Sequence, residues 1–201
     1  MENEFQFEQM EHVVLQDDKA LLRIIKPEDA AHLVDFAEKE PDLFLYTLAA
    51  PDSKEKMVAY VETAVKEFKN KVSIPFIVYD KQQLHYAGTT RIYDFNWKFK
   101  SMTIGFTWYG KAYQGTGLNK HCKYLLLSYA FEELGMERVE FRADSQNENS
   151  IAAMKSIGCT VEGILRSHMP NNTGGRRHSI ILSILKDEWF GAVKAMLHAK
   201  L

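Results

Sequence analysis

The chain has 201 residues, of which 46% are hydrophobic and 12% aromatic, and its formal net charge at pH 7 is −2. These values predict one compact domain with a packed core, and they exclude a disordered chain and a strongly basic nucleic-acid-binding protein. The two cysteines, Cys122 and Cys159, have neither metal-binding nor redox spacing, so we expect reduced, buried thiols and no bound metal. No stretch reaches the roughly 20 apolar residues of a membrane span. The acidic N-terminus lacks a signal-peptide core, so we expect a cytoplasmic protein without nucleic-acid or membrane partners.

The first part of the chain predicts a strand followed by two helices. Residues 1–19 are expected to form an N-terminal extension, and residues 20–26 have the pattern of a strand. Pro27 suits a first helical position, and apolar residues recur after it at helical spacing. Ser53 is a suitable N-cap for a second helix, whose apolar stripe runs to Phe68. Three β-rich segments follow, at residues 73–80, 85–95 and 100–109.

The pattern changes at residues 110–120, which read Gly-Lys-Ala-Tyr-Gln-Gly-Thr-Gly-Leu-Asn-Lys. Here a glycine-rich turn joins a predicted strand to an amphipathic helix that should end near Gly135. Glycines allow backbone conformations that other residues avoid. The unpaired amides and the dipole at the start of a helix favour phosphate groups. The remaining expected elements are a strand at 138–143, a helix at 147–157 and strands at 160–169 and 177–185.

This order of elements predicts a mixed α/β (α+β) fold, in which a central mixed sheet is flanked by helices. The two strands that precede and follow the glycine-turn helix should pair in parallel. A Walker loop would need a lysine and a serine or threonine after Gly117, and a dinucleotide fingerprint would need a third glycine. Neither motif fits. From the glycine turn alone, a purely structural loop remains an open alternative.

Several motifs in the second half stand in a fixed order. They are Gly115-Thr-Gly117, Asn147-Glu-Asn-Ser150, Ile157-Gly158-Cys159, Glu162-Gly163-x-Leu165-Arg166 and Ser183-Ile-Leu-x-x-Glu188-Trp189. Together they resemble the GNAT N-acetyltransferase superfamily, and most closely its ribosomal-protein N-acetyltransferase-like branch. The resemblance covers roughly residues 20–190, which we take as one acetyltransferase domain with a helical tail at 191–201. It implies that the central sheet is splayed.

The resemblance also implies acetyl-coenzyme A as a cosubstrate, bound by three sets of residues. The turn residues whose amides would hold its pyrophosphate are Gln114, Gly115, Thr116, Gly117, Leu118 and Asn119. The strand residues whose backbone would pair with the pantetheine arm are Phe106, Thr107 and Trp108. The helix residues beside the arm would be Asn147, Asn149 and Met154, the last at a position where the family often has tyrosine. Lys120 and Lys123 are candidates for the 3′-phosphate, or else solvated helix charges.

The implied reaction moves an acetyl group to a primary amine, either a protein N-terminus or a small molecule, by direct transfer in a ternary complex. Ser150 is a candidate for assisting the leaving thiolate, with a plain helix hydroxyl as the alternative. His168 is a candidate for proton removal, with a structural role as the alternative. Two other functions stay open: a non-catalytic coenzyme A-binding module and a transferase of a longer acyl group. The sequence leaves open the acceptor, the general base and the oligomeric state, for which a homodimer is one alternative.

Overall fold

The computed structural model describes Met10 and residues 12–48, 50–172 and 174–201, so most of the expected N-terminal extension lies outside the described residues. The strands are β1 Val14–Gln16, β2 Ala20–Ile24, β3 Ser73–Asp80, β4 His85–Asn96, β5 Ser101–Tyr109, β6 Arg138–Asp144, β7 Thr160–Pro170 and β8 Arg176–Leu185. The longer helices are α2 Ala30–Lys39, α3 Lys54–Lys69, α4 Leu118–Ser128 and α5 Glu148–Ser156. Shorter helical segments are η1 Pro27–Asp29, η2 Pro41–Phe44, η3 Lys111–Tyr113, η4 Tyr129–Glu133, α6 Lys186–Glu188, η5 Trp189–Val193 and α7 Lys194–His198.

The eight strands form one mixed sheet in the order β1-β2-β3-β4-β5-β6-β8-β7. β5 and β6 pair in parallel, and every other neighbouring pair is antiparallel. The parallel pair encloses α4, as a crossover connection between parallel strands requires. The expected mixed sheet with parallel pairing around the glycine-turn helix is therefore confirmed.

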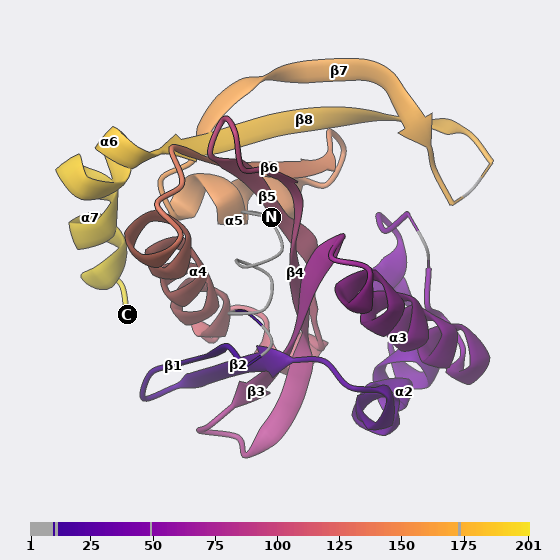
Figure 1. Ribbon diagram of the computed structural model, residues 1–201. Helices are drawn as coiled ribbons and strands as arrows, with labels where there is room; N and C mark the ends of the chain where they lie inside the picture. Colours follow the sequence, from indigo (N-terminus) through magenta and orange to yellow (C-terminus); the bar gives the residue numbers. More distant parts are fainter. Residues whose placement is uncertain (1–9, 11, 49, 173) are drawn as a thin grey trace.

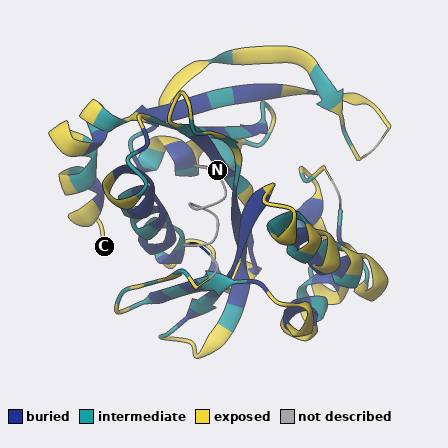
Figure 2. Cartoon of the chain, in the orientation of Figure 1, coloured by how far each residue is buried: buried dark blue, intermediate teal, exposed yellow. Residues whose placement is uncertain are grey.

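Helices cover both faces of this sheet (Figure 1). On one face α4, α5 and the C-terminal helices bury the larger core, which contains Phe141 and Trp189. On the other face α2 and α3 pack over β3 and β4 around a smaller core that contains Phe44 and Trp108. Figure 2 shows that the strands between these layers are mostly buried, whereas β7 at the sheet edge is largely exposed.

Local signals explain most element boundaries. Ser53 caps α3, because its hydroxyl accepts a hydrogen bond from the Lys56 amide at 3.3 Å. Gly135 follows the η4 extension of α4 with φ +63°, which is a common way for a helical segment to end. Several elements go beyond the sequence-based expectation, among them the three-residue strand β1, which pairs with β2, and the short helices η2, η3 and α6. No helix of the described residues is both long enough and apolar enough to cross a bilayer.

Candidate functional site

The sheet opens between β5 and β6. The two strands pair in parallel over four positions, which end at Ile104 opposite Phe141. Beyond this point β5 continues along β4 to Tyr109, while β6 continues along β8 to Asp144. The later part of β5 therefore has a free edge toward the gap, and backbone groups on such an edge can pair with an extended ligand.

A bulge lies in this free part of β5. Phe106 has φ +49°, in the left-handed region that residues other than glycine seldom adopt, and the pairing with β4 is irregular between Thr89 and Arg91. The Phe106 ring lies under the guanidinium of Arg91, with 4.4 Å from Cζ to the ring centroid. The Thr107 hydroxyl lies 2.8 Å from that of Thr90, and both contact α4 through Lys123. Phe106 and Thr107 therefore face opposite sides of the sheet, as successive residues of a strand do.

Trp108, the third strand residue expected at the ligand, has its side chain in the core. It is 6% exposed and packs edge-on against Phe36 and Phe44, with ring centroids 5.7 and 5.1 Å apart. The sequence leaves the role of this side chain undecided, and the structure assigns it to packing. The backbone of Trp108 remains part of the free β5 edge.

The glycine turn presents unpaired amides at the start of α4. Gly115 and Gly117 have φ +73° and +90°, and Gly117 is the N-cap of the helix. The amides of Gly115, Thr116, Gly117 and Asn119 have no hydrogen-bond acceptor within the described part of the chain. The Leu118 amide makes one long contact of 3.4 Å with the Thr116 hydroxyl. Four free amides beside the positive end of an 11-residue helix are the groups to which anions bind in other proteins.

Gln114 differs from the other five residues of the predicted turn set. Its amide donates to the Lys111 carbonyl at 3.2 Å, and its Nε2 donates to the Tyr109 carbonyl at 2.9 Å. These bonds hold the turn against the end of β5. The backbone amide of Gln114 is therefore already engaged.

Sequence reasoning missed Lys19, which lies just before β2. Its ammonium donates to the Thr116 carbonyl at 2.6 Å and lies 3.8 Å from where a Cβ on Gly117 would stand. It adds a positive charge beside the free amides. The separation of 97 residues hid this neighbour, because only the packing of α4 near β1 and β2 brings the two segments together.

The residues predicted on α5 lie at and after its first turn. Asn147 is the N-cap, and its Oδ1 accepts a hydrogen bond from the Ser150 amide at 3.0 Å. Asn149 is exposed and the Ser150 side chain is half-buried. Met154 is buried in the core, so its thioether lies inside the protein rather than on the helix surface.

The two predicted catalytic residues are not hydrogen-bonded to one another. His168 lies on β7, and its Nδ1 is 3.0 Å from the hydroxyl of Ser179 on β8, which also accepts from Arg177 Nε at 3.1 Å. Ser150 lies on α5, which follows β6. Since β8 separates β7 from β6, the chain does not form a hydrogen-bonded Ser150–His168 pair.

Lys123 corrects a sequence-based expectation. Its expected place is the surface of α4, as a ligand of the 3′-phosphate or a solvated charge, but its side chain is 4% exposed. Nζ donates to the hydroxyls of Thr107 at 2.7 Å and Thr90 at 3.3 Å, which places it beneath β4 and β5 rather than at the turn. Burial lowers the pKa of Lys123 to about 8, because the charged form loses solvation.

Both cysteines are buried, as predicted. Burial raises the pKa of the Cys122 thiol to about 12, and it does the same for Cys159. Neither residue is therefore a thiolate nucleophile at neutral pH.

A cavity of about 860 Å³ lies on the α3 side of the bulge. It is lined by η2, α3, β4 and β5, and the Phe106 ring forms part of its wall. Within it Arg91 Nη1 lies 2.5 Å from Glu67 Oε2, and the Arg91 guanidinium also faces the Tyr60 ring. The Asn172 side chain, from the loop between β7 and β8, reaches this rim and donates to the carbonyls of η2 and its C-cap at 3.1 and 3.2 Å.

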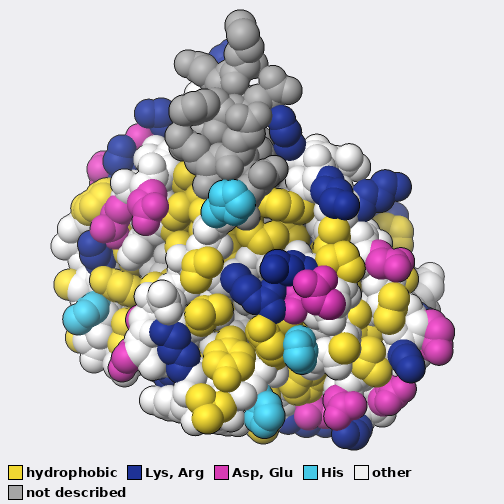
Figure 3. Space-filling view, turned by 60° about the horizontal axis from the view of Figure 1, so that its bottom comes forward, with side chains coloured by type: hydrophobic (Ala, Val, Ile, Leu, Met, Phe, Trp, Pro, Cys, Tyr) yellow, Lys and Arg dark blue, Asp and Glu magenta, His cyan; other side chains and the backbone are white. Residues whose placement is uncertain are grey.

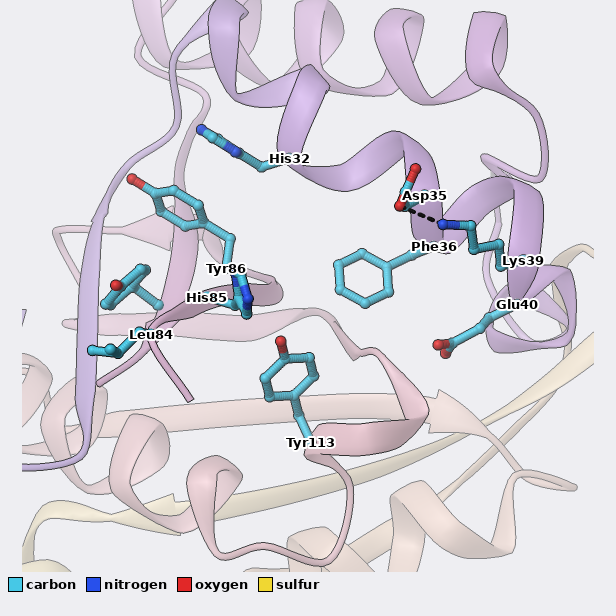
Figure 4. A pocket seen from close by; sticks show the side chains of 10 residues that line it. His32, Asp35, Phe36, Lys39, Glu40, Leu84, His85, Tyr86 and Tyr113 are labelled. Carbon is cyan, nitrogen blue, oxygen red and sulfur yellow. Dashed lines mark hydrogen bonds and ion pairs between the residues drawn. The ribbon is translucent and has the colours of Figure 1, made fainter. Parts of the chain in front are cut away.

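A second cavity of about 420 Å³ lies between α2 and the β3–β4 turn (Figure 4). His32 and Tyr86 lie on one side of it, with ring centroids 4.4 Å apart, and the Asp35–Lys39 ion pair lies on another. None of the predicted site residues lines it. On the face shown in Figure 3, charged side chains of both signs are scattered among hydrophobic ones.

One group of potential metal ligands exists among the described residues, formed by Asp17, Asp18 and His121. The Asp17 carboxylate already accepts from the amides of Lys19 and Ala20 and lies 2.8 Å from His121 Nδ1. These contacts lower the pKa of Asp17 despite its partial burial. The Asp17 carboxylate thus stabilises the turn between β1 and β2 and joins it to His121 on α4.

Comparisons with known proteins agree with this geometry. Residues 19–160 match the family described as the acetyltransferase (GNAT) domain. The protein named "Putative ribosomal N-acetyltransferase YdaF" from Bacillus subtilis (strain 168) is 26% identical over 176 residues, covering 85% of this chain and 93% of that protein. A solved structure titled as an acetyltransferase from T. thermophilus is 28% identical and superposes with a TM-score of 0.84, covering 94% of this chain and 96% of that one. A GCN5-related N-acetyltransferase from Brucella melitensis, 22% identical, has the same fold with a TM-score of 0.85, covering 94% of this chain and 85% of that one. The free β5 edge, the amide-lined turn and these matches together show that the chain belongs to the GNAT acetyltransferase family.

Proposed function

We propose that this protein transfers an acetyl group from acetyl-coenzyme A to a primary amine, directly and within a ternary complex. The observation that carries the proposal is that β5 leads from a free strand edge, through the one-turn helix η3, into the amide-lined turn of α4. A ligand with a diphosphate at one end and an extended, amide-containing arm at the other matches both features. Coenzyme A has this chemistry.

The turn amides and Lys19 would bind the diphosphate. Gly115, Thr116, Gly117 and Asn119 each have a free backbone N–H, and the Lys19 ammonium lies beside them. Hydrogen bonds from such amides to an anion are stronger than neutral ones, and the helix dipole adds to them. Asn119 also has a buried Oδ1 without a partner in the described part of the chain.

The free edge of β5 would hold the pantetheine arm. The backbone of Phe106, Thr107 and Trp108 lies at this edge, and the arm would pair with it like an added strand. Asn147 and Asn149, near the start of α5, are our candidates for further hydrogen bonds, and Met154 for an apolar contact.

The acceptor would approach through the 860 Å³ cavity, because the bulge residue Phe106 belongs both to the cavity wall and to the free edge. There the protein would hold the neutral amine against the thioester carbonyl. Holding two reactants together in this way can contribute roughly 7–11 kcal/mol in favourable cases. The buried, protonated thiols support direct transfer rather than an acetyl-cysteine intermediate. For Ser150 and His168 we keep the roles given above as proposals.

The relative named as a ribosomal N-acetyltransferase supports a protein N-terminus as the acceptor over a free small amine. A panel of N-terminal peptides and small amines, with thiol release as the readout, tests this choice. Coenzyme A binding without turnover across the panel would favour a non-catalytic binding module instead. Tighter competition by a longer acyl-coenzyme A would favour a different acyl donor.

Gly117→Ala tests the turn assignment, with Gly135→Ala as the matched control. Both glycines have positive φ and no crowding neighbour, so both variants should lose a similar stability of about 1–2 kcal/mol. Only the Gly117 variant should lose affinity for coenzyme A, by about tenfold or roughly 1.4 kcal/mol in calorimetry. Equal affinities in the two folded variants would refute the assignment.

Lys19→Met tests the added charge. We expect affinity for coenzyme A to fall about threefold at low salt, with a smaller difference at high salt, because the ammonium is partly exposed. Calorimetry at two salt concentrations measures this. An affinity that does not change in either condition would remove Lys19 from the site.

A further inference from the structure

Lys123 is a buried cation whose hydrogen-bond partners are hydroxyl groups. Its Nζ donates to the hydroxyls of Thr107 and Thr90, which lie 2.8 Å from one another. No carboxylate among the described residues forms an ion pair with it. Buried charges are normally paired, so a lysine held in this way is a candidate for a functional group.

Its position relates it to the free edge of β5. Lys123 lies on α4 five residues after Leu118, and it falls between the fully buried Leu126 and Leu127 around the helix. Its side chain therefore runs under the sheet and ends at Thr107, one of the three strand residues proposed to line the pantetheine arm. The ammonium thus lies beneath β4 and β5 at the level of the bulge, and its use in the reaction requires that the thioester sulfur be held at this level of β5.

The titratable groups that act on Lys123 are few. From α4 itself comes the Cys122 thiol, and from the segment after α5 comes the Cys159 thiol. Burial raises the pKa of both thiols to about 12, so both stay protonated over the neutral range. Thr90 on β4 and Thr107 on β5, which accept its hydrogen bonds, do not titrate in this range. The protonation state of Lys123 is therefore set by its own burial.

We propose that the Lys123 ammonium stabilises and protonates the thiolate that leaves when the acetyl group is transferred. This inference rests on the proposed function, because it requires coenzyme A in the gap beside β5. It assigns a residue to the protonation step, for which Ser150 was the sequence-based candidate.

The step balances in atoms and charge. The acceptor nitrogen forms a bond to the acetyl carbon, and the C–S bond breaks with its electron pair remaining on sulfur. One Nζ–H bond of Lys123 breaks and an S–H bond forms, leaving Lys123 as a neutral amine. The acceptor nitrogen releases one proton to water, and Lys123 takes one up from water. The net reaction consumes only the thioester and the amine.

The acidity of Lys123 fits this step. The pKa of Lys123 is about 8, and the reference pKa of a free thiol is about 8.5. A donor and an acceptor of nearly equal pKa exchange a proton without a large penalty in either direction. An ordinary surface lysine, with a reference pKa of about 10.4, would be a weaker acid by roughly two pH units.

Three variants test the proposal in the 201-residue chain. Lys123→Met removes the charge and the proton, Lys123→Arg keeps the charge but cannot lose its proton near pH 8, and Lys155→Met is the control. Lys155 is exposed on α5, so its loss matches the change in net charge without touching the β5 edge. The measurements are kcat and KM from pH 6.5 to 9.5, the affinity for coenzyme A, and the thermal midpoint.

In the wild-type chain and in Lys155→Met, kcat should fall as pH rises through about 8, because the ammonium loses its proton there. In Lys123→Met, kcat should fall about 100-fold at pH 7, and the alkaline limb of the pH profile, which is the decrease of kcat above about pH 8, should be absent. The affinity for coenzyme A should change less than about threefold. Lys123→Arg should retain a larger kcat than the methionine variant, also without the limb. A purely structural role would leave the pH profile unchanged.

A folded Lys123→Met with wild-type kcat and an unchanged alkaline limb would overturn the proposal. NMR of wild-type protein labelled with [13Cε]lysine is the second measurement, because it does not depend on how the variants fold. It should contain one lysine signal that titrates near 8 and shifts when reduced coenzyme A is added. If no lysine titrates below pH 9.5, the proposal also fails. If the wild-type chain transfers acetyl groups to no amine, the proposed function itself has failed, which is a different result.

Discussion

Two buried cations lie on opposite faces of the β4–β5 pair, and their surroundings differ. Arg91 and Lys123 are 3% and 4% exposed. Arg91 is paired with Glu67 at 2.5 Å and lies over the ring of Phe106, whereas Lys123 has only the hydroxyls of Thr90 and Thr107. The buried charge of Arg91 is compensated by a carboxylate, whereas burial among hydroxyls lowers the pKa of Lys123, so that this side chain can lose its proton. The comparison separates a charge that supports structure from a charge that can take part in chemistry.

Arg91→Met should give the largest effect, because it leaves the partly buried Glu67 carboxylate without its partner. We expect the free energy of unfolding to fall by about 3 kcal/mol, near the low end for broken buried pairs since Glu67 is 33% exposed. Urea unfolding at pH 7 measures it. Stability within experimental error of the wild type would mean that the pair contributes little.

Lys123→Met should have the opposite sign and stabilise the protein. In the folded chain the pKa of Lys123 is about 8, and in an unfolded chain it is about 10.4, so the fold disfavours the charged form by about 3 kcal/mol. This penalty is full below pH 8, declines as pH rises, and is absent above about 10.4. The gain from methionine should therefore be about 2 kcal/mol at pH 7 and shrink toward pH 10 in urea titrations. A loss of stability at pH 7 would contradict the comparison.

Glu67→Gln should have a smaller effect than Arg91→Met, although it removes the same ion pair. The amide oxygen can still accept from the Ser73 hydroxyl, which now donates to Glu67 Oε2 at 2.9 Å, and Arg91 keeps its contacts with two rings. We expect a loss of about 1 kcal/mol. If Glu67→Gln loses as much unfolding free energy as Arg91→Met, the negative charge of Glu67, and not the packing of the buried Arg91 side chain, makes the main contribution to stability.

Thr107→Val should have the smallest effect. It removes the nearer of the two hydroxyls that accept from Lys123, so the charged form becomes less favourable and the pKa should fall below 8 by less than about one unit. The lysine signal in NMR reports this shift. A rise in the pKa would mean that Thr107 does not stabilise the ammonium.

The elements were predictable where local signals agreed with burial. Apolar spacing and the Ser53 cap located α3, and a β-rich composition located the three strands from β3 to β5. β1 was missed because three residues carry too little periodicity, and its pairing with β2 depends on tertiary contact.

The site was only partly predictable. The turn amides follow from glycine spacing and a helix start, both of which are local. Lys19 approaches the turn only because the fold brings it there, across 97 positions. The burial of Lys123 was missed because charge usually marks a solvated face. Seen along the axis of α4, Lys123 lies between the apolar residues Leu126 and Leu127, and this position was the signal in the sequence that its side of the helix is buried.

The short parallel ladder between β5 and β6 has a mechanical consequence. Four residue pairs, from Ser101 to Ile104 on β5, join the two halves of the sheet edge to edge. A small rotation of β5 about this ladder would displace its C-terminal end, at Tyr109, much more than its N-terminal end, at Ser101. The width of the gap beside Thr107 is therefore set by the geometry of these four pairs.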